Sequence, residues 1–190
     1  MILSEDDLIR KNIKNDEFDK KLSELREKYL SQIYSNYMFF SLENKETRER
    51  LVYSTNLEWQ SNYIDHKMID SCPLYAATVL SPRNYRLDRS FFLWNQIIPE
   101  GKMQRDVIGV RAEHGIANGL SITKKIGNYQ AMLGLASDPK DHELERNYTM
   151  FLPKIITLFA AASSLCFSKQ GSISETILIR TVSNDFKNNF

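Results

Sequence analysis

Apolar residues recur at helical spacing in the N-terminal part of the chain. After Asn15, apolar side chains stand three or four residues apart, at Phe18, Leu22, Leu25, Tyr29 and Ile33. This period predicts an amphipathic helix with one face against a core, and Asn15 is a suitable N-cap for it. Ser4 and Asp7 form a capping-box pattern that predicts another helix upstream. We therefore expect residues 1–30 to form a helical segment.

Short apolar runs bounded by polar turns predict two pairs of strands. Residues 36–42 and 50–54 flank a polar turn, which is the pattern of two paired strands. Residues 120–123 and 129–136 flank a Gly-Asn turn at 127–128, and a glycine-containing turn of this kind favours a hairpin. The pattern therefore predicts strand, turn and strand in both regions.

Helical spacing continues between the two pairs of strands. Residues 56–70 place Trp59 and Tyr63 four positions apart, on the same face of a helix. Pro73 is expected to end that helix, because proline disfavours helical geometry in the residue before it. Residues 74–80 fit a helix or a strand equally well.

A long helix is predicted to begin near Asp141. Its apolar seam alternates steps of four and three residues, at Tyr148, Phe151, Ile155, Leu158, Ala162 and Leu165. Such a seam can bury itself against the domain's own sheet or against a partner helix. Pro153 falls within the helix and is expected to kink it.

Composition places the chain among ordinary globular proteins. It has 190 residues, 42% hydrophobic and 26% charged, which fits one domain with a helical arm. The 25 Lys and Arg residues nearly balance the 24 Asp and Glu residues, whereas nucleic-acid-binding domains usually carry a clear basic excess. The acidic N-terminus is unlike a secretory signal, and the longest apolar stretch is shorter than a membrane span. We expect a cytoplasmic domain without direct contact to nucleic acid or membrane.

Familiar catalytic and metal-binding motifs are missing from the sequence. The three histidines lack paired-ligand spacing, and Cys72 and Cys166 are far apart and form no metal or redox motif. The glycines at 115 and 119 match neither GxGxxG nor a phosphate loop ending in GK and Ser or Thr. A GxSxG motif is also missing. We expect no metal, no cofactor, no catalytic residue and no enzymatic activity.

Aromatic residues gather in the middle of the chain. Trp59, Tyr63 and Trp94, with Phe91 and Phe92 nearby, combine flat apolar surfaces with polar tips. Large aromatic side chains bury much area, and a buried indole N–H or phenol O–H needs a hydrogen-bond partner. Such a cluster lines a ligand pocket or fills a core, and the residues alone leave both interpretations open.

Four sequence blocks resemble a known family. The stretch WQSNYIDHKM at 59–68, followed by Cys-Pro at 72–73, is similar to the W-Q-S-x-Y-x-D-x-K stretch of TraR-like quorum-sensing receptors. The blocks at 91–94, 115–122 and 132–138 resemble the aromatic block, the start of the fourth strand and the fifth strand of these receptors. The blocks also follow the family's order. The chain thus resembles the autoinducer-binding domain of LuxR/TraR-type regulators.

The resemblance implies a fold and a binding site. The family's domain is α+β, a three-layer αβα sandwich with a central five-stranded antiparallel sheet and helices on both faces. It binds an N-acyl-homoserine lactone between the sheet and one helical layer, and it dimerises largely through its long last helix. By resemblance, Trp59 donates its indole N–H to a lactone-type carbonyl, and Tyr63 and Trp94 wall the pocket. Ile116 and Met132 would contact an acyl chain.

Three positions depart from the family's ligand contacts. Cys72 stands where the family has an aspartate that accepts a hydrogen bond from the ligand amide, and a thiol is a weak acceptor. Thr55 holds the spacing of a tyrosine one helical turn before Trp59, and Gly134 stands where a Thr or Ser hydroxyl helps to hold the ligand carbonyl. Losing three polar contacts of about 1 kcal/mol each weakens lactone binding about 100-fold. A standard acyl-homoserine lactone is therefore disfavoured as the ligand.

The resemblance and the chain length together predict the domain boundaries. Residues 1–30 form the helical segment, 31–170 the autoinducer-binding-like domain, and 171–190 a tail too short for the helix-turn-helix domain that follows in family members. We expect a sensor of a small, non-standard signal or, alternatively, an antiactivator that needs no ligand. In both cases we expect a homodimer, or a heterodimer with a LuxR-type regulator, formed through residues 141–168.

Overall fold

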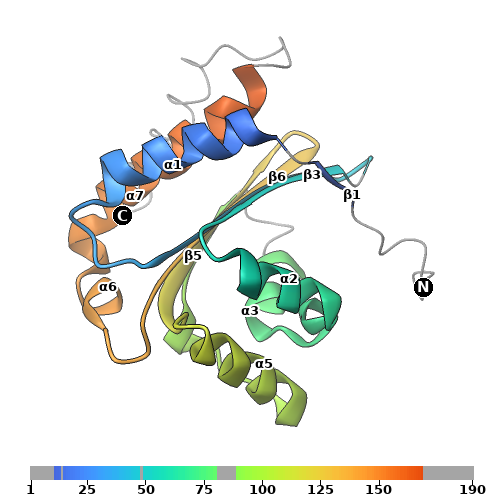
Figure 1. Cartoon of the computed structure of the whole chain (residues 1–190), viewed down its shortest axis with the longest axis vertical. Helices are drawn as coiled ribbons and strands as arrows, with labels where there is room; N and C mark the ends of the chain where they lie inside the picture. Colours follow the sequence, from blue (N-terminus) through green and yellow to red (C-terminus); the bar gives the residue numbers. More distant parts are fainter. Residues whose placement is uncertain (1–10, 14, 48, 81–88, 169–190) are drawn as a thin grey trace.

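A six-stranded sheet forms the centre of the domain (Figure 1). The computed structural model describes residues 11–13, 15–47, 49–80 and 89–168. The strands are β1 (Lys11–Ile13), β2 (Tyr37–Asn44), β3 (Glu49–Ser54), β4 (Arg89–Leu93), β5 (Asn118–Ile126) and β6 (Tyr129–Ser137). Their order across the sheet is β1-β3-β2-β6-β5-β4, and all neighbours among β2 to β6 pair antiparallel. The predicted α+β fold with a five-stranded antiparallel sheet is confirmed.

The short strand β1 adds one parallel neighbour to this sheet. It pairs with β3, with Lys11 opposite Glu49. The helix predicted over residues 1–30 is therefore wrong at β1. A sheet edge presents unpaired N–H and C=O groups, and β1 pairs with those of β3, which local sequence does not reveal. The capping-box prediction at Ser4 and Asp7 lies outside the described residues.

Helices cover both faces of the sheet (Figure 1). On one face lie α1 (Asp16–Leu30) and α7 (Tyr148–Ser168), packed side by side, with the short α6 (Glu143–Arg146) leading into α7. On the other face lie α2 (Leu57–Asp65), α3 (Pro73–Tyr75) and α5 (Gly101–Glu113). Shorter helical turns are η2 (Met68–Ser71), η3 (Ala76–Leu80) and η4 (Trp94–Gln96). The three predicted layers are present.

The helix α1 forms as its apolar period predicts. Asn15 caps it by accepting a hydrogen bond from the N–H of Phe18 at 3.1 Å, and Phe18 and Leu22 are buried in the main core. Phe18 packs against Phe40 of β2, and Phe40 packs against Phe159 of α7, with ring centroids 6.2 and 6.4 Å apart. This face of the sheet is thus an apolar core shared with both helices.

The segment after β3 differs from its prediction. The helix α2 ends at Asp65, before the expected stop, and the chain turns through Lys67, whose φ of 51° is left-handed. Pro73 does not end a helix but begins α3, because its fixed φ suits the first helical position, where its missing N–H is not needed. The undecided segment 74–80 is helical, as the end of α3 and the π-helical turn η3.

The helix α5 was not anticipated from the sequence. Its buried residues are Val107 and Arg111, one of which is charged. A helix that buries so narrow an apolar face leaves little periodic signal. Its place on the sheet is set by tertiary packing rather than by a pattern along the chain.

The helix α7 buries its apolar seam inside the domain. Phe151, Ile155, Leu158 and Ala162 all belong to the main core, so the seam faces the domain's own sheet and α1. The outer side of the helix includes Met150, which is 67% exposed. By length and composition, α7 is the one helix of the described ranges that could cross a membrane, but 56% of its apolar window is buried within the domain. Such burial is typical of the core helix of a globular domain.

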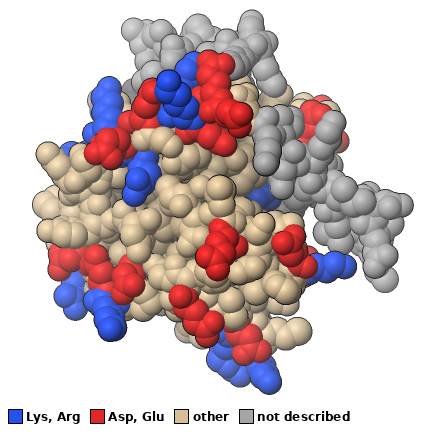
Figure 2. All heavy atoms as spheres, in the orientation of Figure 1, with Lys and Arg blue, Asp and Glu red and all other residues tan. Residues whose placement is uncertain are grey.

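Charged side chains are mixed on the face drawn in Figure 2. Lysines and arginines stand among aspartates and glutamates there, with uncharged surface between them. Binding to a phosphate backbone relies on several clustered cations, and the described part of this face carries no large patch of one sign. The distribution agrees with the near balance of 25 basic and 24 acidic residues in the whole chain.

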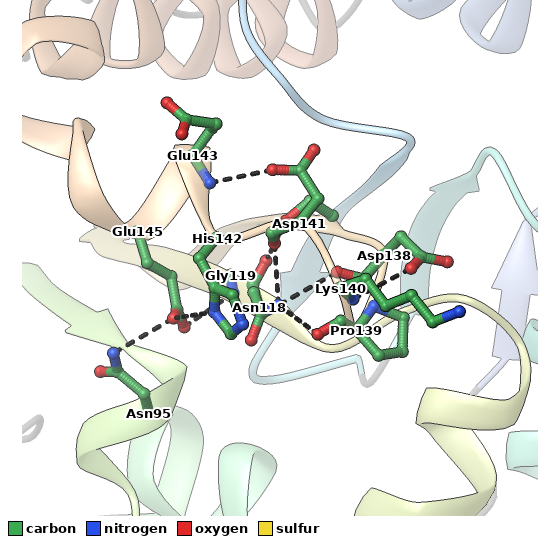
Figure 3. A network of polar contacts seen from close by, with 11 residues as sticks. Asn95, Asn118, Gly119, Asp138, Pro139, Lys140, Asp141, His142, Glu143 and Glu145 are labelled. Carbon is green, nitrogen blue, oxygen red and sulfur yellow. Dashed lines mark hydrogen bonds and ion pairs between the residues drawn. The ribbon is translucent and has the colours of Figure 1, made fainter.

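A polar network fixes the end of the hairpin formed by β5 and β6 (Figure 3). The Asn118 side chain donates at 2.8 to 3.1 Å to three backbone carbonyls of the following turn, those of Asp138, Pro139 and Asp141. One carboxylate oxygen of the buried Glu145 accepts from the N–H of Gly119 at 3.1 Å. The other oxygen accepts from the side chain of Asn95 at 3.1 Å. The carboxylate thus ties α6 both to β5 and to η4.

Gly119 is the most crowded of the three glycines in this hairpin. A Cβ there would collide with the carbonyl oxygen of Leu135 and lie 2.9 Å from Cε3 of Trp94. The hydrogen bond from Gly119 to Glu145 holds the backbone in place. A side chain at this position would therefore displace the Trp94 ring.

Replacing Gly119 with Ala is expected to lower the free energy of unfolding by about 1–3 kcal/mol, because the added methyl group overpacks the site. Gly134→Ala is the matched control in the neighbouring strand, since a Cβ there meets its nearest atom at an ordinary 3.6 Å. Urea unfolding of both variants measures the difference. Equal stabilities of the two variants would contradict the close packing at Gly119.

Candidate ligand-binding site

A cavity lies between the sheet and the helices α2, α3 and α5. It offers about 80 Å³ to the centres of water-sized molecules, several times what one buried water needs. The strands β2, β5 and β6 supply one wall through residues such as Phe39, Ser121 and Met132. The helices α2 and α5 supply the facing wall through Trp59 and Arg111. The cavity therefore joins apolar, aromatic and polar side chains from elements far apart in the sequence.

Six of the eight residues singled out in the sequence line this cavity, namely Trp59, Tyr63, Cys72, Trp94, Met132 and Gly134. The remaining two do not. Ile116 is 1% exposed and belongs to the apolar cluster around the cavity. The Oγ1 atom of Thr55 accepts a hydrogen bond from the N–H of Met38 at 2.9 Å, and so it supports the backbone. Contact of a ligand with these residues stays a prediction.

Trp59 and Tyr63 form one aromatic wall on α2. Asn56 caps this helix by accepting a hydrogen bond from the N–H of Trp59 at 2.9 Å, which fixes where the helix begins. The one-turn spacing brings the two rings to 5.3 Å between centroids, and the ring of His114 lies 5.5 Å from that of Trp59. Trp59 is therefore held by neighbours on its own helix and at the end of α5.

The phenols of Tyr37, which is buried, and of Tyr63, which is partly buried, line the cavity. Burial raises the pKa of Tyr37 to about 12, against smaller opposite effects of Ser54 and Arg111. Burial also holds the pKa of Tyr63 well above its usual value, and Cys72 acts in the same direction. Both phenols therefore keep their protons at neutral pH and can donate hydrogen bonds.

Trp94 is fixed to the sheet by a hydrogen bond. Its Nε1 donates to Oγ of Ser121 at 2.8 Å, and Ser121 lies opposite Gly134 in the pairing of β5 with β6. A Cβ at Gly134 would lie 3.6 Å from Trp94, so the backbone does not require glycine there. Ser121 thus provides a hydroxyl beside the position where the resemblance placed one on residue 134.

Cys72 serves as a helix cap in this structure. Its Sγ accepts a hydrogen bond from the N–H of Tyr75 at 3.5 Å, and the residue is buried. The acceptor capacity of a thiol is weak, and here it is directed to the first turn of α3. The position therefore stabilises the local backbone as well as lining the cavity.

Charged residues also reach the cavity from the strands β2 and β3. Glu43 and Arg50 both line it, are buried, and lie opposite each other in the pairing of the two strands. Glu43 forms an ion pair with Lys45 at 3.4 Å, and the Arg50 guanidinium lies 5.9 Å from the centre of the Phe39 ring. This pair of opposite charges was not anticipated from the sequence.

Arg111 is the most unusual residue of the cavity, and the sequence-based reasoning missed it. It is 6% exposed, and its guanidinium carbon lies 4.7 Å from the centre of the Trp94 ring. Burial lowers its pKa from the usual value, while Cys72, Tyr63 and Tyr37 act in the opposite direction. Its Nε has no hydrogen-bond partner among the described residues.

One signal in the sequence could have revealed Arg111. Val107 and Arg111 stand four residues apart, and they would share one face of a helix over 101–113. A helix prediction there would have placed a cation on the side that packs against the sheet. Without that helix, Arg111 is one of 25 Lys and Arg residues with nothing to distinguish it.

The chain belongs to the autoinducer-binding domain family. The family model described as "Autoinducer binding domain" matches residues 23–163, which is most of the chain. The match covers β2 to β6 and every residue that lines the cavity. No curated protein matches the chain significantly.

Three solved structures share the fold. CepR2 from Burkholderia cenocepacia, described as an N-acylhomoserine lactone dependent LuxR family transcription factor, is 13% identical; 78% of this chain and 94% of that chain are covered, with a TM-score of 0.52. The VqsR ligand-binding domain from Pseudomonas aeruginosa is 15% identical, with coverages of 77% and 90% and a TM-score of 0.52. SdiA from Escherichia coli is 12% identical, with coverages of 90% and 86% and a TM-score of 0.51. At these identities the likeness shows the fold alone.

Ser121→Ala is expected to lower the free energy of unfolding by about 1–3 kcal/mol, because it leaves the buried indole N–H of Trp94 without its acceptor. Ser41→Ala is the matched control, since Ser41 lines the same cavity from β2 and its loss leaves the indole N–H of Trp94 with its acceptor, so it should cost less stability than Ser121→Ala. Urea unfolding followed by circular dichroism measures both. A Ser121→Ala variant as stable as Ser41→Ala would show that the Trp94 bond contributes nothing.

Tyr37→Phe is expected to reduce the loss of stability at high pH. The folded-state pKa of Tyr37, about 12, lies above its unfolded value of about 10, so its contribution is complete below pH 10 and is lost as the pH rises towards 12. The free energy of unfolding of the unmodified protein should therefore fall by up to about 1.4 kcal/mol per pH unit more steeply than that of the variant. Urea unfolding between pH 9 and pH 11.5 measures the slopes. Tyr34→Phe, at a position that is 59% exposed, should keep the original slope; if it flattens the slope equally, burial is not the cause.

Proposed function

We propose that the domain is a sensor that binds a small, mainly apolar signal molecule in the cavity between the sheet and α2, α3 and α5. The observation that carries the proposal is the cavity itself, which contains both tryptophans of the chain within a domain of the autoinducer-binding family. The description of CepR2 as N-acylhomoserine lactone dependent supports a signal of that general kind. A partly apolar cavity with a few convergent polar groups is the usual form of a small-molecule site.

The lining residues take different roles in this proposal. Trp59 is the polar anchor and donates its indole N–H to a carbonyl of the signal. Tyr63 and Trp94 wall the cavity, and Met132 contacts the apolar part of the ligand. Ile116 does not line the cavity, so in this proposal it packs within the apolar cluster that surrounds the lining residues.

A standard acyl-homoserine lactone fits these side chains poorly. The thiol of Cys72 caps α3, and Thr55 is bonded to the backbone of Met38. Gly134 offers no hydroxyl. A ligand therefore finds polar partners elsewhere, at Tyr37, Trp59 and the helix α5.

The open cavity also bears on the antiactivator hypothesis. A ligand-independent partner protein would fill its pocket with its own side chains, whereas about 80 Å³ stays open here. This favours the sensor. Pairing through residues 141–168 stays a prediction, and because Leu158 and the rest of the seam are buried, it would use the outer side of α7 around Met150.

Trp59→Phe is expected to weaken ligand binding about tenfold, because it removes one hydrogen bond to the ligand and little of the apolar wall. Small molecules that co-purify with the full chain from its native host are identified by mass spectrometry. The compound found, together with a panel of lactones and pyrones, is then titrated by calorimetry into the unmodified protein and the variant.

The control for this titration is Phe91→Leu. Phe91 stacks on Tyr148 with ring centroids 5.4 Å apart and packs against the main core rather than the cavity. The Phe91→Leu variant should be less stable than the unmodified protein but should bind the ligand with the same affinity. The sensor proposal fails if no compound binds, or if both variants lose affinity to the same extent.

A further inference from the structure

Arg111 brings a buried positive charge to the cavity without a matching negative one. The residue is 94% buried, lines the cavity, and points its guanidinium at the Trp94 ring, 4.7 Å away. Within the described ranges no carboxylate forms an ion pair with it, and its Nε has no hydrogen-bond partner. A buried cation without a counter-charge is strongly destabilising, because no protein group replaces the hydration that the guanidinium loses on burial.

The neighbours of Arg111 do not neutralise it. The face of an indole attracts a guanidinium, but it carries no net charge. Burial raises the pKa values of Tyr37 and Tyr63, so these phenols are neutral donors at neutral pH rather than anions. The groups that act on Arg111 are thus the indole face of Trp94, the two phenols and Cys72, and none of them is a carboxylate.

The cavity as a whole is also positive. Its charged lining residues in the described part of the chain are Glu43, Arg50 and Arg111, with a net charge of +1. Glu43 lies opposite Arg50 and forms an ion pair with Lys45. Its negative charge is therefore already balanced within β2, β3 and the turn between them. The uncompensated charge is therefore that of Arg111.

We propose that the signal is an organic carboxylate, whose negative group binds Arg111 and whose apolar body lies along Trp59, Trp94 and Met132. This inference rests on the proposed function and names the chemical class of the ligand. A carboxylate matches the planar fork of a guanidinium with two parallel hydrogen bonds. The phenol of Tyr37 donates a further hydrogen bond to the same group.

A single negative charge fits the site better than a double one. A phosphate monoester carries about −1.5 to −2 charges at neutral pH, which would exceed the one free cation of the described lining and leave a buried anion. A neutral lactone or ester leaves Arg111 uncompensated. A monoanion with an apolar body balances the charge of Arg111 and brings no second negative charge into the cavity.

The test uses pairs of related probes in which one member carries a carboxylate and the other is neutral. One pair is N-hexanoyl-homoserine lactone and its ring-opened carboxylate, and the other is 3-phenylpropanoate and its primary amide. Calorimetry at constant ionic strength is expected to give a carboxylate at least about tenfold tighter than its neutral partner. In Arg111→Met this preference should vanish, while Arg105→Met, the same change on the exposed side of α5, should keep it.

A second measurement needs no ligand. Arg111→Met removes an uncompensated buried charge, so the ligand-free variant is expected to melt a few degrees higher than the unmodified protein. A structural role for Arg111 would instead lower the melting temperature. Arg111→Gln serves as a second neutral variant if Arg111→Met does not fold, as judged by circular dichroism.

The outcomes separate the two proposals. If neutral probes bind as tightly as the carboxylates, or if Arg111→Met keeps the preference, the sensor stands and the carboxylate inference is wrong. If none of the four probes binds the unmodified protein at millimolar concentration but the co-purified compound or a member of the lactone and pyrone panel does, the carboxylate inference is wrong and the sensor stands. If no compound of either set binds, both proposals are wrong. A tenfold preference that depends on Arg111 and not on Arg105 supports both.

Discussion

Alternation along the three central strands divides the molecule into an apolar core and a cavity. Successive side chains of a strand point to opposite faces of the sheet. Met38, Phe40 and Leu42 of β2 enter the core with α1 and α7, whereas Phe39 and Ser41, which lie between them, line the cavity. The strands β5 and β6 alternate in the same way, and a shift of one residue in any of them would exchange the two sets. The pairing register is therefore what keeps the cavity separate from the core.

The cavity face depends on contacts that reach it from outside. Trp94 holds its position through Ser121, and the chain after it is held by the bond from Asn95 to Glu145. Gly119 lets the Trp94 ring lie close against the sheet, and Arg111 lies over that ring. The position of Arg111 thus follows from a network centred on α6, a short helix that does not line the cavity.

Local patterns predicted those parts of the molecule that are determined locally. The hairpin of β5 and β6, the capped helix α1 and the buried seam of α7 follow from turn residues, a cap and an apolar period, all readable within one segment. The aromatic residues Trp59, Tyr63 and Trp94 were singled out as a cluster in the sequence, the family resemblance then assigned them to a pocket, and they line one cavity. In contrast, β1 and α5 are held by tertiary contacts and carry weak patterns of their own. Arg111 was missed for the same reason, since its burial depends on how α5 meets the sheet.

An aromatic cluster fits a core or a pocket, and the polar groups around it decide between the two. A core built only for stability replaces buried polar groups with apolar ones, because an unpaired donor costs about 1–3 kcal/mol and a buried charge costs more. Here the cluster includes Arg111, Glu43 and two phenols, and it encloses open space. Local rules of stability are most often broken at functional sites. The combination of a stable apolar face and a polar, incompletely filled one is what a domain needs if it is to fold without a ligand and still gain free energy when one binds.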